Sequence, residues 1–205
     1  MFVVAESGDG VVGAAEMKRR PGAIHLNYIA VRPDYRRRHL GRQLLGAAIR
    51  CSGESSGEIV LDVFDENASA VTWYTKLGFT VGSRSDLVEL VAPQRGASGS
   101  GYIAELAQAD ACHQRFGFSQ FSVLTKRGRC PVGRLGEGWF RLCHPDGVTD
   151  PEVFAALRLL DPGRRIFGVL RDDQVPHEQV VRTVVRSSRM TADIRETVSR
   201  LEVWP

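Results

Sequence analysis

The segment VRPDYRRRHLGRQLL, residues 31–45, is the most informative stretch of the sequence. A predicted strand ends at Pro33, and an apolar pattern over residues 40–50 predicts a helix. Arg36, Arg37, Arg38 and Arg42 add positive charge around the start of this helix. A helix entered from such a loop presents unpaired N–H groups and the positive end of its dipole to solvent. The segment therefore predicts an anion site that suits a diphosphate, and the alternative is an ordinary helix start with solvated arginines.

The residues on both sides of this segment alternate between strand and helix patterns. In order, they predict strands at 2–5, 11–17 and 24–31, the helix at 40–50, a strand at 59–64, a helix that starts at 68 and stops at Gly78, and a strand at 86–91. This order predicts an α/β fold for the first half of the chain.

A stretch rich in Gly, Pro and Ser, VAPQRGASGSG at residues 91–101, predicts a boundary between a core at 1–95 and an extension at 96–205. In the extension we expect strands at 118–124, 138–143 and 166–170 and a helix that begins after Asp150. An apolar stripe predicts a further helix over 177–201, so the extension is also α/β. Residues 66–83 align without gaps on 105–122. This likeness indicates either chance or a degenerate second copy of one unit.

Two motifs in the first half resemble a known family. Residues 31–45 are similar to the acyl-coenzyme A loop of the GNAT superfamily of N-acetyltransferases, which reads Arg/Gln-x-x-Gly-x-Gly/Ala after a strand that ends in Val-x-Pro. Arg36, His39 and Gly41 stand at the marked positions, and His39 replaces the first glycine. Residues 61–79, LDVFDENASAVTWYTKLGF, are similar to the later segment of the family. The resemblance covers about residues 2–90 and is closest to the branch that acetylates protein N-termini, whereas residues 96–205 have no assigned counterpart.

The resemblance implies a mixed, splayed central sheet with flanking helices that lacks the usual opening strand and helices. Those absent helices normally form much of the acceptor site, so either the extension or a second protomer of a homodimer is expected to complete it. The implied co-substrate is acetyl-CoA or another acyl-CoA. The residues expected to bind it are Ile29, Ala30, Val31, Arg36, Arg37, Arg38, His39, Leu40, Gly41, Arg42, Asn67 and Tyr74.

The chemistry that the family implies needs a proton donor and a proton acceptor. Tyr74 stands where the family keeps its acid and would face the departing sulfur. The base is either Asp62 or His25, and strand alternation predicts that His25 shares a face with Ile29 and Val31. We therefore expect acetyl transfer from acetyl-CoA to a primary amine of a small molecule or protein by direct attack. The alternative is a non-catalytic acyl-CoA-binding regulatory or scaffold module.

The composition excludes several other classes of protein. With 27 basic and 24 acidic residues, the net charge of +3 is too small to indicate a nucleic-acid binder. No stretch of the sequence has the 18 consecutive apolar residues of a membrane span, and the first ten residues do not resemble a secretory signal. The four cysteines, Cys51, Cys112, Cys130 and Cys143, lack zinc-site spacing. We therefore expect a cytoplasmic protein without a metal.

Overall fold

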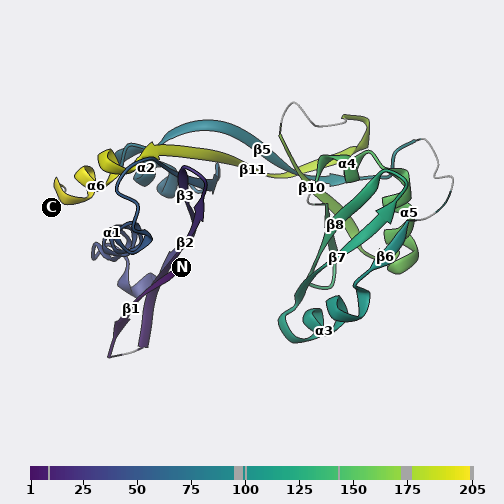
Figure 1. Cartoon of the computed structure of the whole chain (residues 1–205), viewed down its shortest axis with the longest axis horizontal. Helices are drawn as coiled ribbons and strands as arrows, with labels where there is room; N and C mark the ends of the chain where they lie inside the picture. Colours follow the sequence, from purple (N-terminus) through teal and green to yellow (C-terminus); the bar gives the residue numbers. More distant parts are fainter. Residues whose placement is uncertain (9, 95–98, 100, 143, 172–176, 204–205) are drawn as a thin grey trace. The chain divides into compact units, whose positions relative to one another are not determined.

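The computed structural model describes residues 1–8, 10–94, 99, 101–142, 144–171 and 177–203, which belong to two compact units (Figure 1). Unit 1 combines Met1–Ser83 with Ser187–Pro205, and unit 2 is Arg84–Arg186. These units differ from the predicted division into 1–95 and 96–205, and the predicted boundary itself lies outside the described residues. They differ because the end of the chain returns to the sheet of unit 1.

Unit 1 contains a mixed sheet with the strand order β1-β2-β3-β4-β11-β5. Its strands are β1 (Phe2–Ser7), β2 (Gly10–Arg20), β3 (Ala23–Val31), β4 (Glu58–Phe64), β5 (Thr80–Leu90) and β11 (Val180–Asp193). The pairs β1–β2, β2–β3 and β4–β11 are antiparallel, and β3–β4 is parallel. Strands β5 and β11 each have residues in both units.

The helices of unit 1 pack on one face of this sheet. They are the short η1 (Pro33–Tyr35) and the helices α1 (Leu40–Ser52), α2 (Ala68–Lys76) and α6 (Ile194–Val203). Leu45 of α1, Leu61 of β4 and Ile194 of α6 belong to one buried cluster with Leu77 and Phe79. Each such side chain contributes roughly 1.5–3 kcal/mol when it is fully buried. Among the described residues, no helix of unit 1 contributes to a cluster on the opposite face.

The predicted helix over 177–201 is wrong for most of its length. The structure has the short η3 (His177–Gln179), then strand β11, and only the end of the segment is the helix α6. Residues Val180–Val185 are rich in β-branched side chains, which favour strands. Further along β11, Ser188, Met190 and Ala192 are buried and alternate with more exposed residues. The segment therefore forms a strand because it pairs with β4, although its apolar stripe indicated a helix.

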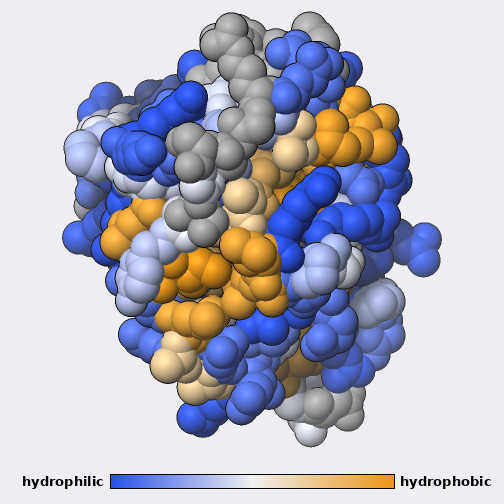
Figure 2. Space-filling view, turned by 90° about the vertical axis from the view of Figure 1, so that its right-hand side faces the viewer, coloured by the Kyte–Doolittle hydropathy of each residue, from blue (hydrophilic) through white to orange (hydrophobic). Residues whose placement is uncertain are grey.

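Unit 2 continues the strand order from β5 as β10-β9-β8-β7-β6. Its other elements are β6 (Tyr102–Ala104), α3 (Leu106–Phe116), β7 (Phe118–Thr125), β8 (Gly128–Leu135), β9 (Trp139–Leu142), α4 (Pro145–Val148), α5 (Pro151–Leu160) and β10 (Arg165–Arg171). Phe121, Phe140 and Phe154 are fully buried in its core. Apolar side chains also reach the surface between hydrophilic ones, as the face in Figure 2 shows, and Tyr102 and Leu159 of unit 2 are among the exposed ones.

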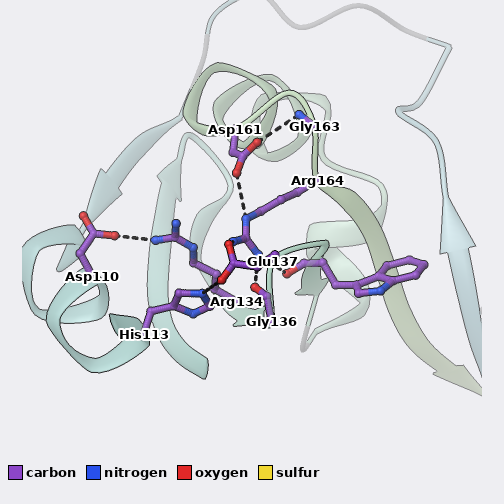
Figure 3. A network of polar contacts seen from close by, with 9 residues as sticks. Asp110, His113, Arg134, Gly136, Glu137, Asp161, Gly163 and Arg164 are labelled. Atoms are coloured by element: carbon purple, nitrogen blue, oxygen red, sulfur yellow. Dashed lines mark hydrogen bonds and ion pairs between the residues drawn. The ribbon is translucent and has the colours of Figure 1, made fainter. Parts of the chain in front are cut away.

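A buried arginine organises the turn between β8 and β9 in unit 2 (Figure 3). The Arg164 side chain is 2% exposed, and its Nε donates to Asp161 at 2.9 Å. Its Nη1 donates to the carbonyl oxygens of Gly136 and Trp139 at 2.6 and 3.4 Å. Because a buried guanidinium needs such partners, Arg164 holds the turn against the start of β10.

Candidate active site

A cavity of about 1020 Å³ opens in unit 1 where β3 and β4 separate. The ladder between these parallel strands ends at the pair Leu26–Leu61. Strand β3 continues from Asn27 to Val31, and no strand among the described residues pairs with its outer edge there. The predicted splay is therefore present, and its position follows from where the ladder ends.

A β-bulge lies at the point of separation. Glu16 of β2 pairs with Tyr28 of β3, and Met17 pairs with Leu26, so that Asn27 has no counterpart on β2. A bulge bends a strand and turns its later side chains to the other face. Asn27 is thus the first residue of β3 that has a ladder partner on neither side.

The bulge separates His25 from the residues that were predicted to share its face. Leu26 belongs to the core under the helices, and Ile29 and Val31 pack against that same core. His25 adjoins Leu26 in the strand, so its side chain lies on the opposite face. Strand alternation without a bulge had predicted one common face, and that prediction is wrong.

Beyond the bulge, the peptide groups of β3 present an open edge to the cavity. The N–H of Arg32 donates to Val12 of β2 at 2.9 Å. Because peptide directions alternate along a strand, the groups of Val31 and Ile29 point away from β2. The Val31 carbonyl accepts from Arg36 Nε at 3.1 Å. This edge can pair with an extended chain of amides, as an added strand would.

The loop before α1 forms a cradle for an anion. Arg37 and His39 have φ values of 59° and 62°, in the left-handed region. Such a turn directs successive N–H groups into one concavity. The N-cap His39 makes no side-chain cap hydrogen bond, and the first turn of this 13-residue helix has no acidic residue. The loop therefore fits a diphosphate by backbone geometry as well as by charge.

Most of the predicted site residues line the cavity. They are Ile29, Ala30, Val31, Arg36, Arg37, His39, Leu40, Gly41, Arg42, Asp62, Asn67 and Tyr74. Arg38 is not among the lining residues, and its guanidinium lies 5.0 Å from the centre of the Tyr35 ring. His25 is not among them either. Arg42 lines the cavity and also donates to the backbone oxygen of Leu201 in α6.

Helix α2 places a capping amide and a buried phenol beside the cavity. Asn67 caps the helix, and its Oδ1 accepts from the Ala70 N–H at 3.2 Å. Tyr74 is 7% exposed and packs between Trp73 and Phe79, with ring centres 4.9 and 5.5 Å away. Burial raises the pKa of Tyr74 to about 12. The phenol therefore stays protonated at neutral pH and can donate a hydrogen bond.

The two candidate bases lie together. His25 Nε2 is 3.4 Å from Asp62 Oδ2. Arg189 of β11 donates from Nε and Nη2 to the two oxygens of Asp62, each at 3.0 Å. Burial lowers the pKa of His25, and the nearby Arg20, Arg189 and Lys18 lower it further against the opposing effect of Asp62. His25 is therefore neutral at pH 7.

Several residues around the cavity were missed by the sequence analysis. Arg189 was assigned to a helix, and only the β-branched residues before it could have indicated a strand. The side chain of Asn27 donates to Glu16, and no motif indicated that pair. Tyr28 and Phe64 also line the cavity, and nothing but their aromatic character distinguished them.

The described residues contain neither a helix that could span a membrane nor a cluster that could hold a metal ion. None of the helices in the described part of the chain has the length and hydropathy to span a membrane. The same residues contain no cluster of three or more His, Cys, Asp or Glu side chains that could hold a metal ion.

Comparison with known sequences gives matches to part of the chain. The sequence model of the acetyltransferase (GNAT) domain matches residues 1–81. An uncharacterised protein of Mycobacterium leprae is 38% identical over 82 residues, which are 38% of this chain and 22% of that protein. The chain thus spans about a fifth of the length of this curated relative.

Comparison with solved structures gives matches to nearly the whole chain. A GCN5-related N-acetyltransferase from Sphaerobacter thermophilus has a TM-score of 0.57 and 14% identity, covering 95% of this chain and 81% of that one. A tandem GNAT protein from the clavulanic acid biosynthesis pathway has a TM-score of 0.62 and 14% identity, covering 94% and 82%. At this identity the likeness concerns the fold alone. The sequence match to the acetyltransferase (GNAT) domain covers residues 1–81, and nearly the whole chain has a fold similar to those of these two GNAT proteins.

Proposed function

We propose that unit 1 transfers an acetyl group from acetyl-CoA to a primary amine of a small molecule or protein by direct attack. One observation carries this proposal: a single cavity contains the anion cradle, the open edge of β3 and the buried Tyr74. These three features suit the diphosphate, the amide-bearing arm and the reacting end of one extended molecule. The acyl-CoA supplies the activated thioester.

The loop and β3 would bind and orient the co-substrate. Backbone N–H groups of residues 37–41 hold the diphosphate, and Arg37 adds charge to the same concavity. The peptide groups of Ile29 and Val31 pair with the amides of the pantetheine arm. Asn67 uses Oδ1 in its cap, which leaves Nδ2 for this arm.

The proton transfers fall to residues where β3 and β4 separate. Asp62 lines the cavity and His25 lies behind it, so a proton leaving the acceptor ammonium passes by way of Asp62 to the neutral His25. The neutral amine forms a bond to the acetyl carbon while the carbon–sulfur bond breaks. As the amide forms, its nitrogen releases a second proton to solvent, while Tyr74 donates one proton to the departing sulfur and regains one from solvent. The ammonium thus loses two protons and the thiol gains one, so one proton is released in each turnover.

The experiment has a binding arm and a transfer arm. Calorimetry should show that the full chain binds coenzyme A, and thiol release from acetyl-CoA should increase when a primary amine is added. Coenzyme A binding without transfer to any amine would favour the regulatory or scaffold module. Absence of coenzyme A binding would overturn both the acetyl transfer and the acyl-CoA-binding module.

The pH dependence of turnover identifies the base. Because the pKa of His25 is lowered, His25 remains neutral until the pH falls below its ordinary value of 6.5, so the acidic limb of kcat should have its midpoint below that value. His25→Gln should abolish this limb, whereas Asp62→Asn should slow turnover and keep a limb if His25 still accepts the proton. Persistence of the limb in His25→Gln and its loss in Asp62→Asn would assign the base to Asp62.

A further inference from the structure

Two exposed aromatic side chains flank the gap between β3 and β4. Tyr28 of β3 is 69% exposed, and Phe64 of β4 is 57% exposed. Both line the cavity, together with Asn27 and Asp62. We call these four residues, Asn27, Tyr28, Asp62 and Phe64, the acceptor mouth.

The acceptor mouth lies on the sheet face that the helices of unit 1 leave open. Leu61 and Val63 of β4 are buried under the helices, so Asp62 and Phe64 point to the other face. The bulge has the same effect on β3, where Tyr28 lies opposite to the core-facing Ile29. An acceptor that enters from this face can contact the two aromatic rings and Asp62.

The two acidic side chains at the mouth, Asp62 and Glu16, each lie beside a cationic one. Asp62 is paired with Arg189, and Glu16 lies 3.7 Å from Lys18. Arg20 and Lys18 also act on His25 beside the mouth, where Asp62 is the acidic group that acts on it. These cations lower the attraction of Asp62 and Glu16 for an acceptor with several positive charges.

The polar group of the mouth is fixed in one orientation. The Glu16 side chain is 13% exposed, and its Oε2 accepts from Asn27 Nδ2. With Nδ2 engaged in this way, Asn27 Oδ1 remains as an acceptor for an N–H group. A single amine can therefore be oriented at the point where the strands separate.

We propose that the acceptor is a monoamine that carries its amine on an aromatic body, with the ring packed against Tyr28 and Phe64 and the amine at Asn27 and Asp62. This inference rests on the proposed acetyl transfer and names the substrate class for it. Aromatic faces bind both flat apolar groups and the single positive charge of a protonated amine. The cations beside Asp62 and Glu16 disfavour polyamines and lysine-rich peptides.

The test compares acceptors by steady-state kinetics at saturating acetyl-CoA. The acceptors are 2-phenylethylamine, n-butylamine, spermidine and a lysine-rich peptide. We expect 2-phenylethylamine to have a kcat/KM at least about 10-fold above that of each other acceptor, because its ring buries more apolar surface against Tyr28 and Phe64 than the other acceptors can.

Variants of the two rings locate the effect. Tyr28→Ala and Phe64→Ala should each raise the KM for 2-phenylethylamine about 10-fold and leave the KM for acetyl-CoA unchanged, whereas Phe64→Leu should retain most of the affinity. Phe2→Ala is the matched control, because Phe2 is 70% exposed in the same unit and does not line the cavity.

The outcomes separate this inference from the function on which it rests. Transfer to n-butylamine or spermidine with a kcat/KM equal to or above that of 2-phenylethylamine would overturn the aromatic monoamine. An unchanged KM in both Tyr28→Ala and Phe64→Ala would overturn the mouth as its binding site. Transfer to none of the four acceptors would count against the proposed function itself.

Discussion

The two units have the same order of helices and strands, but the candidate active site lies in unit 1. In unit 1, the antiparallel strands β1, β2 and β3 precede α1, and β4 then pairs parallel to β3. In unit 2, the antiparallel strands β7, β8 and β9 precede α4 and α5, and β10 then pairs parallel to β9. The chain therefore contains the same β-β-β-α-β arrangement twice.

Two local differences separate the unit with the cavity from its counterpart. Helix α1 follows the uncapped His39, whereas α5 follows Asp150, whose Oδ1 accepts from the Glu152 N–H at 3.0 Å. An acidic cap occupies the N–H groups and repels an anion. Strand β3 continues beyond its ladder with β4, whereas the ladder of β9 with β10 extends to Leu142, the last residue of β9. The arrangement alone thus does not make a site, because the helix start and the strand register must also permit one.

The largest expected effect concerns Arg164 of unit 2. This arginine stabilises a turn, whereas arginines of unit 1 lie at the proposed anion cradle. Arg164→Met should lower the free energy of unfolding by about 3 kcal/mol, because the hydrogen bonds of a buried guanidinium to Asp161 and to the carbonyl oxygens of Gly136 and Trp139 are lost. Coenzyme A affinity should not change. Urea unfolding measures the first quantity and calorimetry the second. As a control, Arg129→Met should cost less than about 1 kcal/mol, since the Arg129–Glu105 pair is exposed. Equal losses in both variants would contradict the structural role of Arg164.

The next effect concerns Tyr74, which has no counterpart in a helix after β10 among the described residues of unit 2. Tyr74→Phe should lower kcat at least about 100-fold, the lower range for a positioned general acid. The dissociation constant of coenzyme A should stay within a factor of about two, because the ring packing is retained. Tyr102→Phe changes an exposed tyrosine of unit 2 and should leave both quantities unchanged. Undiminished turnover in Tyr74→Phe would mean that another group donates to the sulfur.

A smaller effect distinguishes the two helix starts. Arg37→Glu should weaken coenzyme A binding about 10-fold, or about 1.4 kcal/mol, by reversing a charge at the cradle. Glu152→Gln at the start of α5 should leave the affinity unchanged. Titration calorimetry should also give one coenzyme A for each chain. A stoichiometry of two, or a changed coenzyme A affinity in Glu152→Gln, would show that unit 2 also binds coenzyme A and would contradict this prediction.

The smallest effect concerns two residues with the same strained backbone. His39 and Glu105 both precede helices with φ values of 62° and 67°. His39→Gly should raise the free energy of unfolding by roughly 0.5–1 kcal/mol, since glycine adopts this conformation without strain. Glu105→Gly should raise the free energy of unfolding by less than this or lower it, because the Glu105 carboxylate pairs with Arg129 and accepts from Ser122. Thermal unfolding compares the two variants. A larger gain in stability in Glu105→Gly than in His39→Gly would contradict the stabilising role of the Glu105 carboxylate.

The sequence by itself determined the local features of unit 1. The proline after β3, the arginine run, the apolar spacing of α1 and the Leu-Gly-Phe stop of α2 are short-range signals, and they predicted the order of elements and the GNAT family. Gly78 has a φ of 93°, as a helix stop of this kind requires. The likeness of residues 66–83 to 105–122 did not correspond to the repeat, because it sets α2 against α3, which occupy different places in the order.

Only the tertiary structure decided which residues meet at the candidate site. The return of β11 brings Arg189 to Asp62, across 126 intervening residues that carry no local signal for this pair. The bulge at Asn27 moves His25 to the other face, and a bulge depends on pairing with β2 and so cannot be read from alternation. Short-range patterns fix helices and strands because they depend on neighbouring residues, whereas ladder register and strand return depend on partners far away in the chain.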